Sequence, residues 1–305
     1  MRGHCGWGKW GDGFSIKLTL LLTLLLALQQ QHYPWVAYDK SHSPPAGVMN
    51  FDLRYGQIAL LLTLWVGGVT VLDWGLAWQN GVLILVTCVL SQRLWAGRWQ
   101  GWPSAVITGL SLTILLRAGH PGTLVLAAVL AISSKFLLRV GDKHWFNPAN
   151  FGIVMTLLFT HDAWVNPGQW GSNGLYALVL LGVGAGLLWR ARRWETAGAF
   201  ALTYGGLWGL WYLWLGETAA LMGHHFLSGS LVVFTLLMIT DPRSTPNDRR
   251  GRILWAALVG GVAFIFASQF YWTAAPLWAL FFLSPVTILL DQQWVAPRFV
   301  WGQLG

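Results

Sequence analysis

Ten runs of mostly apolar residues follow one another along the chain, and they constrain its fold more than any other feature. A helix that spans a bilayer needs about 20 such residues. The runs lie near residues 57–78, 80–96, 102–117, 121–139, 148–161, 174–190, 196–215, 221–240, 253–270 and 274–291. Only 10% of the residues are charged and 55% are hydrophobic, whereas a soluble domain carries about 25% charged residues. We therefore expect an all-α, polytopic integral membrane protein with ten transmembrane helices.

The basic residues between these runs alternate along the chain. Loops after the second, fourth, sixth and eighth runs are rich in Lys and Arg, whereas the loops between them have none except Arg117. The positive-inside rule then predicts a multi-pass protein of the inner (plasma) membrane with both chain ends in the cytoplasm. Ten spans also divide into five plus five, and a repeat with an odd number of spans has to be inverted. The net charge of +8 fits this topology and anionic lipid, and it does not require nucleic acid as a partner.

The sequence divides into an N-terminal segment, a membrane domain and a tail. Residues 1–50 hold an apolar stretch at 18–28 and a linker, residues 51–295 form the ten-helix membrane domain, and residues 296–305 form a cytoplasmic tail. The stretch at 18–28 has the form of a signal-peptide hydrophobic region. Cleavage there would conflict with the charge pattern, so we favour an uncleaved cytoplasmic or interfacial helix over an eleventh span.

Two polar motifs stand where apolar runs meet a polar boundary. Residues 144–152 have the sequence HWFNPANFG, and residues 238–246 have the sequence MITDPRSTP. Polar residues and prolines at such places are costly in a bilayer, so they are the first candidates for function. Asn147 and Pro148 suit a capped helix start. A helix N-terminus near cations also suits an anion such as a flavin phosphate, and a cap alone leaves Asn150 unexplained, so both interpretations stay open.

The second motif also allows two interpretations. Asp241 ends a long apolar run, so it either pairs with Arg243 or a neighbouring helix, or serves an ion or ligand. The same helix opens with residues 228–230, Ser-Gly-Ser, which suit close helix packing. For other charges we expect simpler roles: water reaches Asp291 at the end of its span, and Lys135 extends toward the lipid headgroups.

The sequence gives little support for a cofactor that is bound by His or Cys ligands. Cys5 and Cys88 form no CxxC motif, which argues against a disulfide framework or a cysteine-bound cluster. A b-type haem would need His224 or His225 to face a histidine on another helix, and we consider it the weaker alternative.

These motifs resemble those of a known family, which includes the D subunit of the Rnf electron-transport complex and the B subunit of the sodium-translocating NADH:quinone oxidoreductase. Both proteins have a Phe-Asn-Pro-Ala segment that enters a helix, as at residues 146–149 here. Both also have a Ser-Gly helix that ends in Thr-Asp-Pro and a Ser/Thr-Pro turn, matched here by Ser228, Gly229, Thr240, Asp241, Pro242, Thr245 and Pro246. The resemblance covers about residues 51–291, and the Pro-Gly-Gln-Trp-Gly loop at 167–171 is similar to a divergent branch found beside enediyne biosynthesis genes.

The resemblance implies a flavin-containing subunit of a membrane complex that moves electrons while it moves Na+ or H+. In the family one FMN is joined to a threonine of a Ser-Gly-Ala-Thr type motif, but residues 160–172 contain no Gly-Ala-Thr and only Thr160. We therefore expect FMN or riboflavin to bind non-covalently. The expected cofactor-binding residues are Asn147, Pro148, Asn150, Ser228, Gly229, Thr240, Asp241 and Thr245.

The same resemblance implies which partners the chain has. We expect other membrane subunits of an electron-transport complex and the lipid bilayer as partners, and no nucleic acid. No catalytic centre is evident in this chain alone, so NADH oxidation would fall to those subunits. The alternative is a non-redox, transporter-like protein that keeps the scaffold and has lost the covalent flavin.

Overall fold

The computed structural model describes residues 52–299, apart from residues 73, 76, 100, 142, 168–173, 219–222, 224, 225 and 227. In the helix that begins at Gly174, side chains are described from Leu180 onward. The apolar stretch at 18–28, the linker after it, His224, His225 and most of the loop at 167–171 lie outside the described residues. Predictions about those segments therefore stay predictions.

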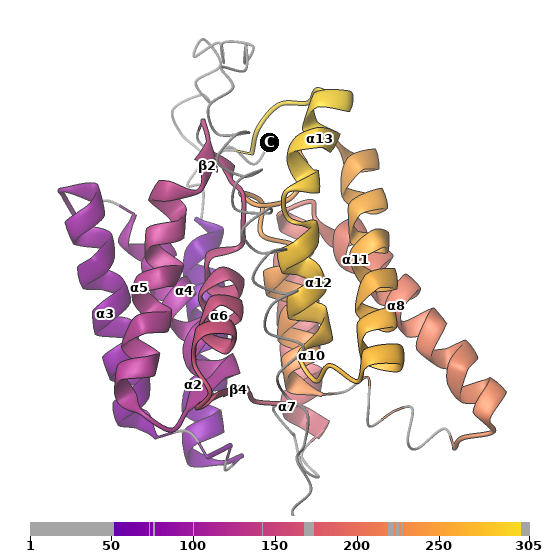
Figure 1. The fold of residues 1–305 in the computed structure, drawn as a ribbon, viewed down its shortest axis with the longest axis horizontal. Coiled ribbons are helices and arrows are strands. Elements are labelled where there is room, and N and C mark those ends of the chain that lie inside the picture. Colours follow the sequence, from indigo (N-terminus) through magenta and orange to yellow (C-terminus); the bar gives the residue numbers. More distant parts are fainter. Residues whose placement is uncertain are drawn as a thin grey trace, which may run out of the picture. The chain divides into compact units, whose positions relative to one another are not determined.

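Helices form along each of the apolar runs, which confirms the predicted all-α class (Figure 1). The earlier runs give α2 (Leu53–Thr70), α3 (Trp78–Ala96), α4 (Trp102–Leu115), α5 (Pro121–Leu137) and α6 (Pro148–Phe159). The later runs give α7 (Gly174–Arg190), α8 (Trp194–Leu215), α10 (Gly229–Val233), the π-helix η1 (Phe234–Met238), α11 (Arg249–Phe270), α12 (Ala275–Leu283) and α13 (Val286–Gln293).

Local sequence explains where many of these helices begin. Proline stands in the first turn of α4, α5, α6 and α12, where its missing N–H costs no hydrogen bond. Asp52 caps α2 by accepting from the backbone N–H of Arg54 at 3.0 Å, and the His120 imidazole caps α5 by accepting from Gly122 N–H at 3.0 Å. Such caps satisfy donors that the helix itself leaves unpaired.

Two of the predicted helices are irregular. The run at 274–291 forms α12 and α13, which are bent by 49° at a break that contains Pro285. Proline cannot donate its backbone nitrogen to the helix ladder, which accounts for the break. In the run that ends near Thr240, η1 replaces the α-helical pattern, and Ile239 N–H donates to Phe234 O at 3.0 Å.

Short antiparallel strand pairs stand at opposite ends of the helices. β1 (Leu116–Ala118) pairs with β4 (Ala163–Val165), with Arg117 opposite Trp164. β2 (Arg139–Val140) pairs with β3 (Lys143–His144). Figure 1 shows β4 at one end of the helices and β2 at the other. We call these two ends the β1 end and the β2 end.

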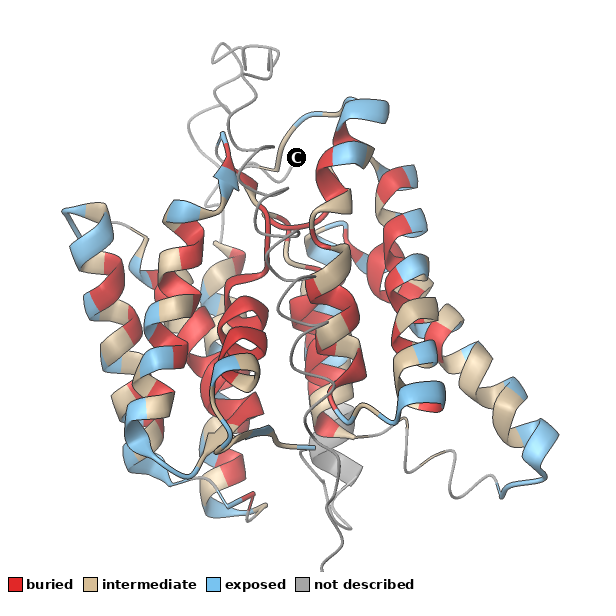
Figure 2. Ribbon diagram, in the orientation of Figure 1, coloured by how far each residue is buried: buried red, intermediate tan, exposed pale blue. Residues whose placement is uncertain are grey.

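The core lies around α4, α6 and α12. Most residues of α4 and α6 are buried, and Figure 2 shows buried positions concentrated on α6 and α12. α4 packs against α2, α3 and α6, whereas α11 packs against α8 and α12. The contact between α6 and α12 joins the earlier helices to the later ones.

Among the described residues, α11 is the one helix that is both long and apolar enough to cross a membrane. The bent pair of α12 and α13 becomes a second if it counts as one span. The helices α4, α5 and α6 are apolar but shorter. The ten-span count therefore stays a prediction.

Candidate functional site

Asn147 joins the two polar motifs that the sequence analysis singled out. Its Oδ1 accepts from Asn150 N–H at 3.1 Å and so caps α6. Its Nδ2 donates to the main-chain oxygen of Met238 at 3.3 Å and to Asp241 Oδ2 at 3.5 Å. The capped helix start is thus correct, and the same side chain also ties α6 to the end of η1.

Asp241 organises the turn that follows η1. Its Oδ1 accepts from the backbone N–H of Arg243 at 3.1 Å, and its Oδ2 accepts from Ser244 Oγ at 3.0 Å. A carboxylate that accepts from the residues two and three positions ahead stabilises a tight turn. Asp241 therefore bonds to the backbone of Arg243 and, through Asn147, to the neighbouring helix α6.

The hydroxyls of Thr240 and Thr245 are committed to the fold. Thr240 Oγ1 donates to Leu236 O at 2.7 Å, and Thr245 Oγ1 donates to Asp241 O at 3.0 Å. Both side chains are buried. They shape the turn around Asp241, and neither hydroxyl proton is left to donate to a ligand.

Asn150 is the site residue with an unused polar atom. The residue is fully buried, and its Nδ2 donates to Leu277 O on α12 at 3.1 Å. Within the described part of the chain, its Oδ1 has no hydrogen-bond partner, and neither has the buried Trp145 Nε1. Buried polar atoms are nearly always paired, so such atoms point to a water, an ion or a ligand.

The predicted site residues separate into two groups. Pro148 stands in the first turn of α6, so Asn147, Pro148, Asn150, Thr240, Asp241 and Thr245 all gather at the β2 end. Ser228 and Gly229 begin α10, at the opposite end of the α10–η1 segment from Asp241. There Ser230 N–H donates to Pro167 O at 3.0 Å.

Thr160, the threonine nearest to the position of the covalent flavin in the family, also lies away from the β2 end. It follows the last residue of α6, and its hydroxyl donates to Thr156 O at 2.8 Å.

Sequence reasoning missed a buried ion pair between Lys143 and Asp291. The two side chains are 7% and 2% exposed, and Asn247 N–H donates to Asp291 Oδ1 at 2.7 Å. The expectation that water reaches Asp291 was wrong, because α13 places this residue against Lys143 of β3. Burial lowers the pKa of Lys143 to about 8, and the carboxylate of Asp291 opposes that shift, so the ammonium keeps its charge at neutral pH.

Two arginines tie the start of α8 to the start of α11 and to the loop after η1. Arg252 contacts Glu195 Oε1 at 2.6 Å through Nη2 and at 3.1 Å through Nε. Arg193, which precedes α8, donates to Thr245 Oγ1 at 3.3 Å and to Pro246 O at 3.4 Å. Neither arginine stood out in the sequence, because both belong to basic loops that the topology alone explains.

Lys135 also differs from its predicted role. Its side chain is buried, and its Nζ donates to both Ser104 O and Ser104 Oγ at 3.1 Å. The lysine therefore does not extend to lipid headgroups. It binds the start of α4 to the end of α5, where Ser104 offers two acceptors.

His144 is a neutral imidazole among cations. Burial, followed by the charges of Arg243, Lys135 and Arg139, lowers the pKa of His144 to about 3. Its Nδ1 is buried and has no hydrogen-bond partner among the residues that the structure describes. The β2 end thus combines buried cations with unpaired polar atoms, an arrangement that favours negative charge on a bound group.

A sequence model of a known family matches the second half of the chain. The sequence model of the NQR2, RnfD, RnfE family matches residues 161–300. This stretch includes Thr240, Asp241 and Thr245 but not Asn147 or Asn150.

The chain is also similar to components of ion-translocating complexes. It is 30% identical over 136 residues to the D subunit of the ion-translocating oxidoreductase complex of Escherichia coli strain Crooks, which covers 44% of this chain and 35% of the relative. The protein of the same name from Escherichia coli strain SMS-3-5 is 30% identical over 122 residues, or 40% of this chain and 34% of the relative. The one from Shigella boydii serotype 18 is 30% identical over 136 residues, with the same coverage as the first.

The chain spans about a third of the length of these relatives. The stretch that the family model matches, residues 161–300, contains the Thr-Asp-Pro turn and the Thr-Pro segment that carry the resemblance. The family model and these relatives thus agree with the family that the motifs resemble.

Proposed function

We propose that this chain is a membrane subunit of an Rnf- or NQR-like electron-transport system. In it, flavin- or quinone-linked electron transfer is coupled to the movement of Na+ or H+. The family match and the names of the relatives support this role. The partners are other membrane subunits of the same complex, which supply the electron donor.

Surface composition supports a multi-pass position in the inner membrane. Large apolar side chains point outward on several helices; Leu94 and Leu202, for example, are 82% and 80% exposed. Exposed apolar area of this kind suits contact with lipid or with other subunits. The basic loops collect at the β2 end, so the positive-inside rule favours a cytoplasmic β2 end and cytoplasmic chain ends.

Helix packing supports two inverted halves of five spans. In the first half α3 packs on α5 and α5 on α6, and in the second half α8 packs on α11 and α11 on α12. The halves meet where α2 contacts α7 and where α6 contacts α12. α2 and α7 are the first spans of the two halves, and α6 and α12 belong to the fifth spans. Contacts between corresponding helices are what a two-fold relation between halves produces, and an odd number of spans makes that relation inverted.

One observation carries the proposed site: Asn150 lies where the two halves meet. Its amide nitrogen bonds to α12, while its Oδ1, which has no partner among the described residues, stays buried at the start of α6, close to the Asn147–Asp241 junction. Transporters with inverted repeats bind ions and substrates at the interface of the repeats, often beside interrupted helices. Here η1 and the break between α12 and α13 are such interruptions. An amide oxygen and a carboxylate suit a partly dehydrated Na+.

The donor set also suits a non-covalent FMN or riboflavin. Asn150 Oδ1 offers an acceptor and Trp145 Nε1 a donor, which is the combination that the N–H and carbonyl edge of an isoalloxazine requires. The cations around His144 would favour a flavin phosphate or a reduced, anionic ring. A bound flavin would supply one- and two-electron redox chemistry, while the residues of this chain hold it and stabilise its charge.

The test is an absorbance and fluorescence spectrum of the complex, purified from native membranes, before and after acid precipitation. We expect acid to release a flavin from the wild type, and Asn150→Leu to lower the amount bound per chain. Ser228→Ala is the matched control, because Ser228 lies at the far end of the α10–η1 segment and should keep the full amount.

Other outcomes would overturn parts of the proposal. Flavin that stays in the protein pellet would mean covalent attachment and contradict the non-covalent site. An equal loss of bound flavin in Asn150→Leu and Ser228→Ala would contradict the site at the β2 end. A wild-type complex with neither flavin nor quinone would favour the non-redox transporter.

A further inference from the structure

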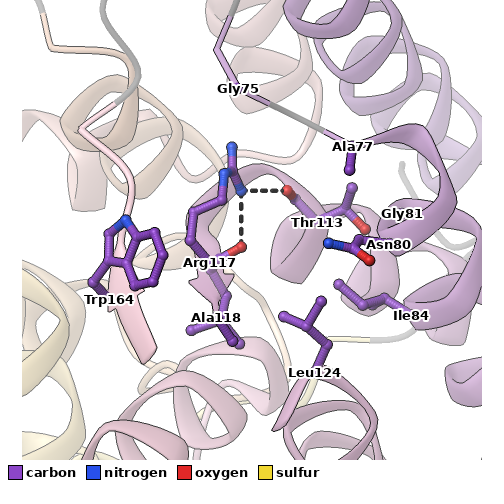
Figure 3. A pocket seen from close by; sticks show the side chains of 11 residues that line it. Gly75, Ala77, Asn80, Gly81, Ile84, Thr113, Arg117, Ala118, Leu124 and Trp164 are labelled. Carbon is purple, nitrogen blue, oxygen red and sulfur yellow. Dashed lines mark hydrogen bonds between the residues drawn. The ribbon is translucent and has the colours of Figure 1, made fainter. Parts of the chain in front are cut away.

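A cavity of about 160 Å³ lies at the β1 end, away from the site around Asn147 (Figure 3). The start of α3, the end of α4, and the strands β1 and β4 enclose it. Ala77, Asn80, Gly81, Arg117 and Trp164 are among the residues that line it. A water molecule fills about 30 Å³ and a drug-sized ligand pocket about 300 Å³ or more, so this cavity suits a small group.

Arg117 brings an incompletely paired guanidinium to this cavity. Figure 3 shows its side chain beside Trp164, with Nη1 bonded to Thr113 O at 2.9 Å and to Leu116 O at 2.8 Å. In the part of the chain that the structure describes, the buried Nε and Nη2 have no hydrogen-bond partner. An arginine stays protonated in proteins, and leaving its buried donors unpaired costs free energy.

The carboxylate nearest in sequence to the facing strand is already used. Asp162, just before β4, accepts from Thr123 Oγ1 at 2.9 Å and from His120 N–H at 3.0 Å. It therefore holds the start of α5. The Coulomb attraction of Arg117 remains available to a group that enters the cavity.

The start of α3 adds a second source of positive potential. Its N-cap residue, Ala77, has no side chain that can accept from the first turn, and that turn holds no acidic residue. Ala77, Asn80 and Gly81, which line the cavity, all belong to this helix start. The N–H groups of Asn80 and Gly81 already donate to Ala77 O, at 3.1 Å and 3.4 Å. The positive end of the helix dipole still attracts anions to this helix start.

We propose that this cavity binds a small oxyanion, a carboxylate or a phosphate group, through Arg117, Asn80 and the first turn of α3. A planar guanidinium with two free donors matches the two oxygens of such a group. The volume excludes a whole isoalloxazine but admits a free anion or the charged part of a larger molecule. This site is separate from the flavin or ion site at the β2 end.

Two exposed tryptophans near the cavity suggest that it lies close to the lipid headgroups. Trp78 and Trp164 are 58% and 54% exposed at this end. Exposed indole rings favour the headgroup level of a bilayer. The oxyanion is then either the phosphate of a lipid headgroup or a free anion from the aqueous side.

At the corresponding place at the β2 end, the guanidinium of Arg193 has protein acceptors. If the halves are inverted as proposed, α8 corresponds to α3, and the loop after η1 corresponds to β1. There Arg193 donates to Thr245 and Pro246, so protein acceptors occupy the guanidinium. At the β1 end a bound oxyanion would accept hydrogen bonds from Arg117, as Thr245 and Pro246 accept them from Arg193. The cavity and Arg117 are independent of this comparison.

The experiment measures anion binding by the full chain in nanodiscs. Inorganic phosphate and acetate are titrated against thermal unfolding in phosphatidylcholine nanodiscs, and native mass spectrometry detects retained phosphatidylglycerol in mixed nanodiscs. Arg117→Gln should weaken the binding by about tenfold or more, the value of hydrogen bonds to a charged group. Arg98→Gln is the matched control, because it removes an exposed arginine elsewhere and should bind like the wild type.

A second variant, Asn80→Asp, tests the site in case the Arg117→Gln protein does not fold. An acidic residue in the first turn of α3 favours the helix, yet it repels an incoming anion and occupies Arg117. We expect it to raise stability and abolish binding. Binding of phosphate or acetate would identify a free anion, and selective retention of phosphatidylglycerol would identify a lipid headgroup. Absence of both, or wild-type binding in Asn80→Asp, would overturn the proposal.

Discussion

Asn147 and Asp241 are 94 positions apart in the sequence, and their side chains meet with 3.5 Å between Nδ2 and Oδ2. Asn147 uses its oxygen to cap α6 and its nitrogen to hold the end of η1. The two uses involve different atoms of one amide. Substitutions can therefore separate the structural role of Asn147 from its role in joining the motifs.

Replacing Asn147 with serine should keep the cap and remove the junction. Serine accepts from a helix N-terminus but is too short to reach Met238 and Asp241. Asn147→Ala loses both and should unfold more easily than Asn147→Ser by about 1 kcal/mol. Thermal unfolding followed by tryptophan fluorescence measures the difference, and bound flavin per chain measures the junction. Equal flavin content in wild type and Asn147→Ser would contradict a role for the junction in binding.

Breaking the ion pair of Lys143 and Asp291 should be strongly destabilising. Lys143→Met leaves Asp291 charged and buried, which costs about 3–5 kcal/mol. The double variant Lys143→Met/Asp291→Asn removes the stranded charge and keeps an acceptor for Asn247 N–H, so it should recover part of the loss. Chemical or thermal unfolding of the two variants in the same detergent gives the comparison. A double variant less stable than Lys143→Met would mean that charge burial is not the cause.

Local signals explain why the helices were predictable. Apolar runs, first-turn prolines and caps such as Asn147 act within a few residues of sequence, so they indicate where each helix begins. Pro285 gave a local sign of the break between α12 and α13. The π-helical pattern before Asp241 has no comparable sign in the sequence, because it depends on how η1 packs.

Pairings across the fold were less predictable, for a physical reason. The two polar motifs lie at span ends that the predicted topology places on the same, cytoplasmic side of the membrane. Their contact in the structure agrees with that prediction. The pairing of Lys143 with Asp291 depends on how α13 packs against β3, which no local pattern encodes. Ser228 and Gly229 were grouped with Asp241 by motif, but the length of the α10–η1 segment separates them.

The contact between α5 and α6 should depend on Gly152. A Cβ at this position would come within 2.6 Å of Ala127 O and 2.7 Å of Ala131 Cβ, so the helices would have to separate. We expect Gly152→Ala to lower the free energy of unfolding by about 1–3 kcal/mol. Gly182→Ala is the matched control, because nothing lies within 4 Å of its Cβ and alanine favours helix. Equal unfolding midpoints for the two variants would argue against close packing at Gly152.

Stability should fall in acid in part because of His144. The pKa of His144 is about 3 in the folded chain and about 6.5 when the imidazole is exposed, so the unfolded state binds a proton that the folded state does not. The folded state loses stability as the pH falls from about 6.5 toward 3, and the loss from this group reaches about 2 kcal/mol at pH 5. The other titratable groups are the same in a His144→Gln variant, so the comparison isolates the imidazole. We therefore expect the unfolding midpoint of His144→Gln to change less between pH 7.5 and 5 than that of the wild type. Parallel pH profiles for the two proteins would mean that the imidazole gains a proton without unfolding, and that the cations around it do not hold it neutral.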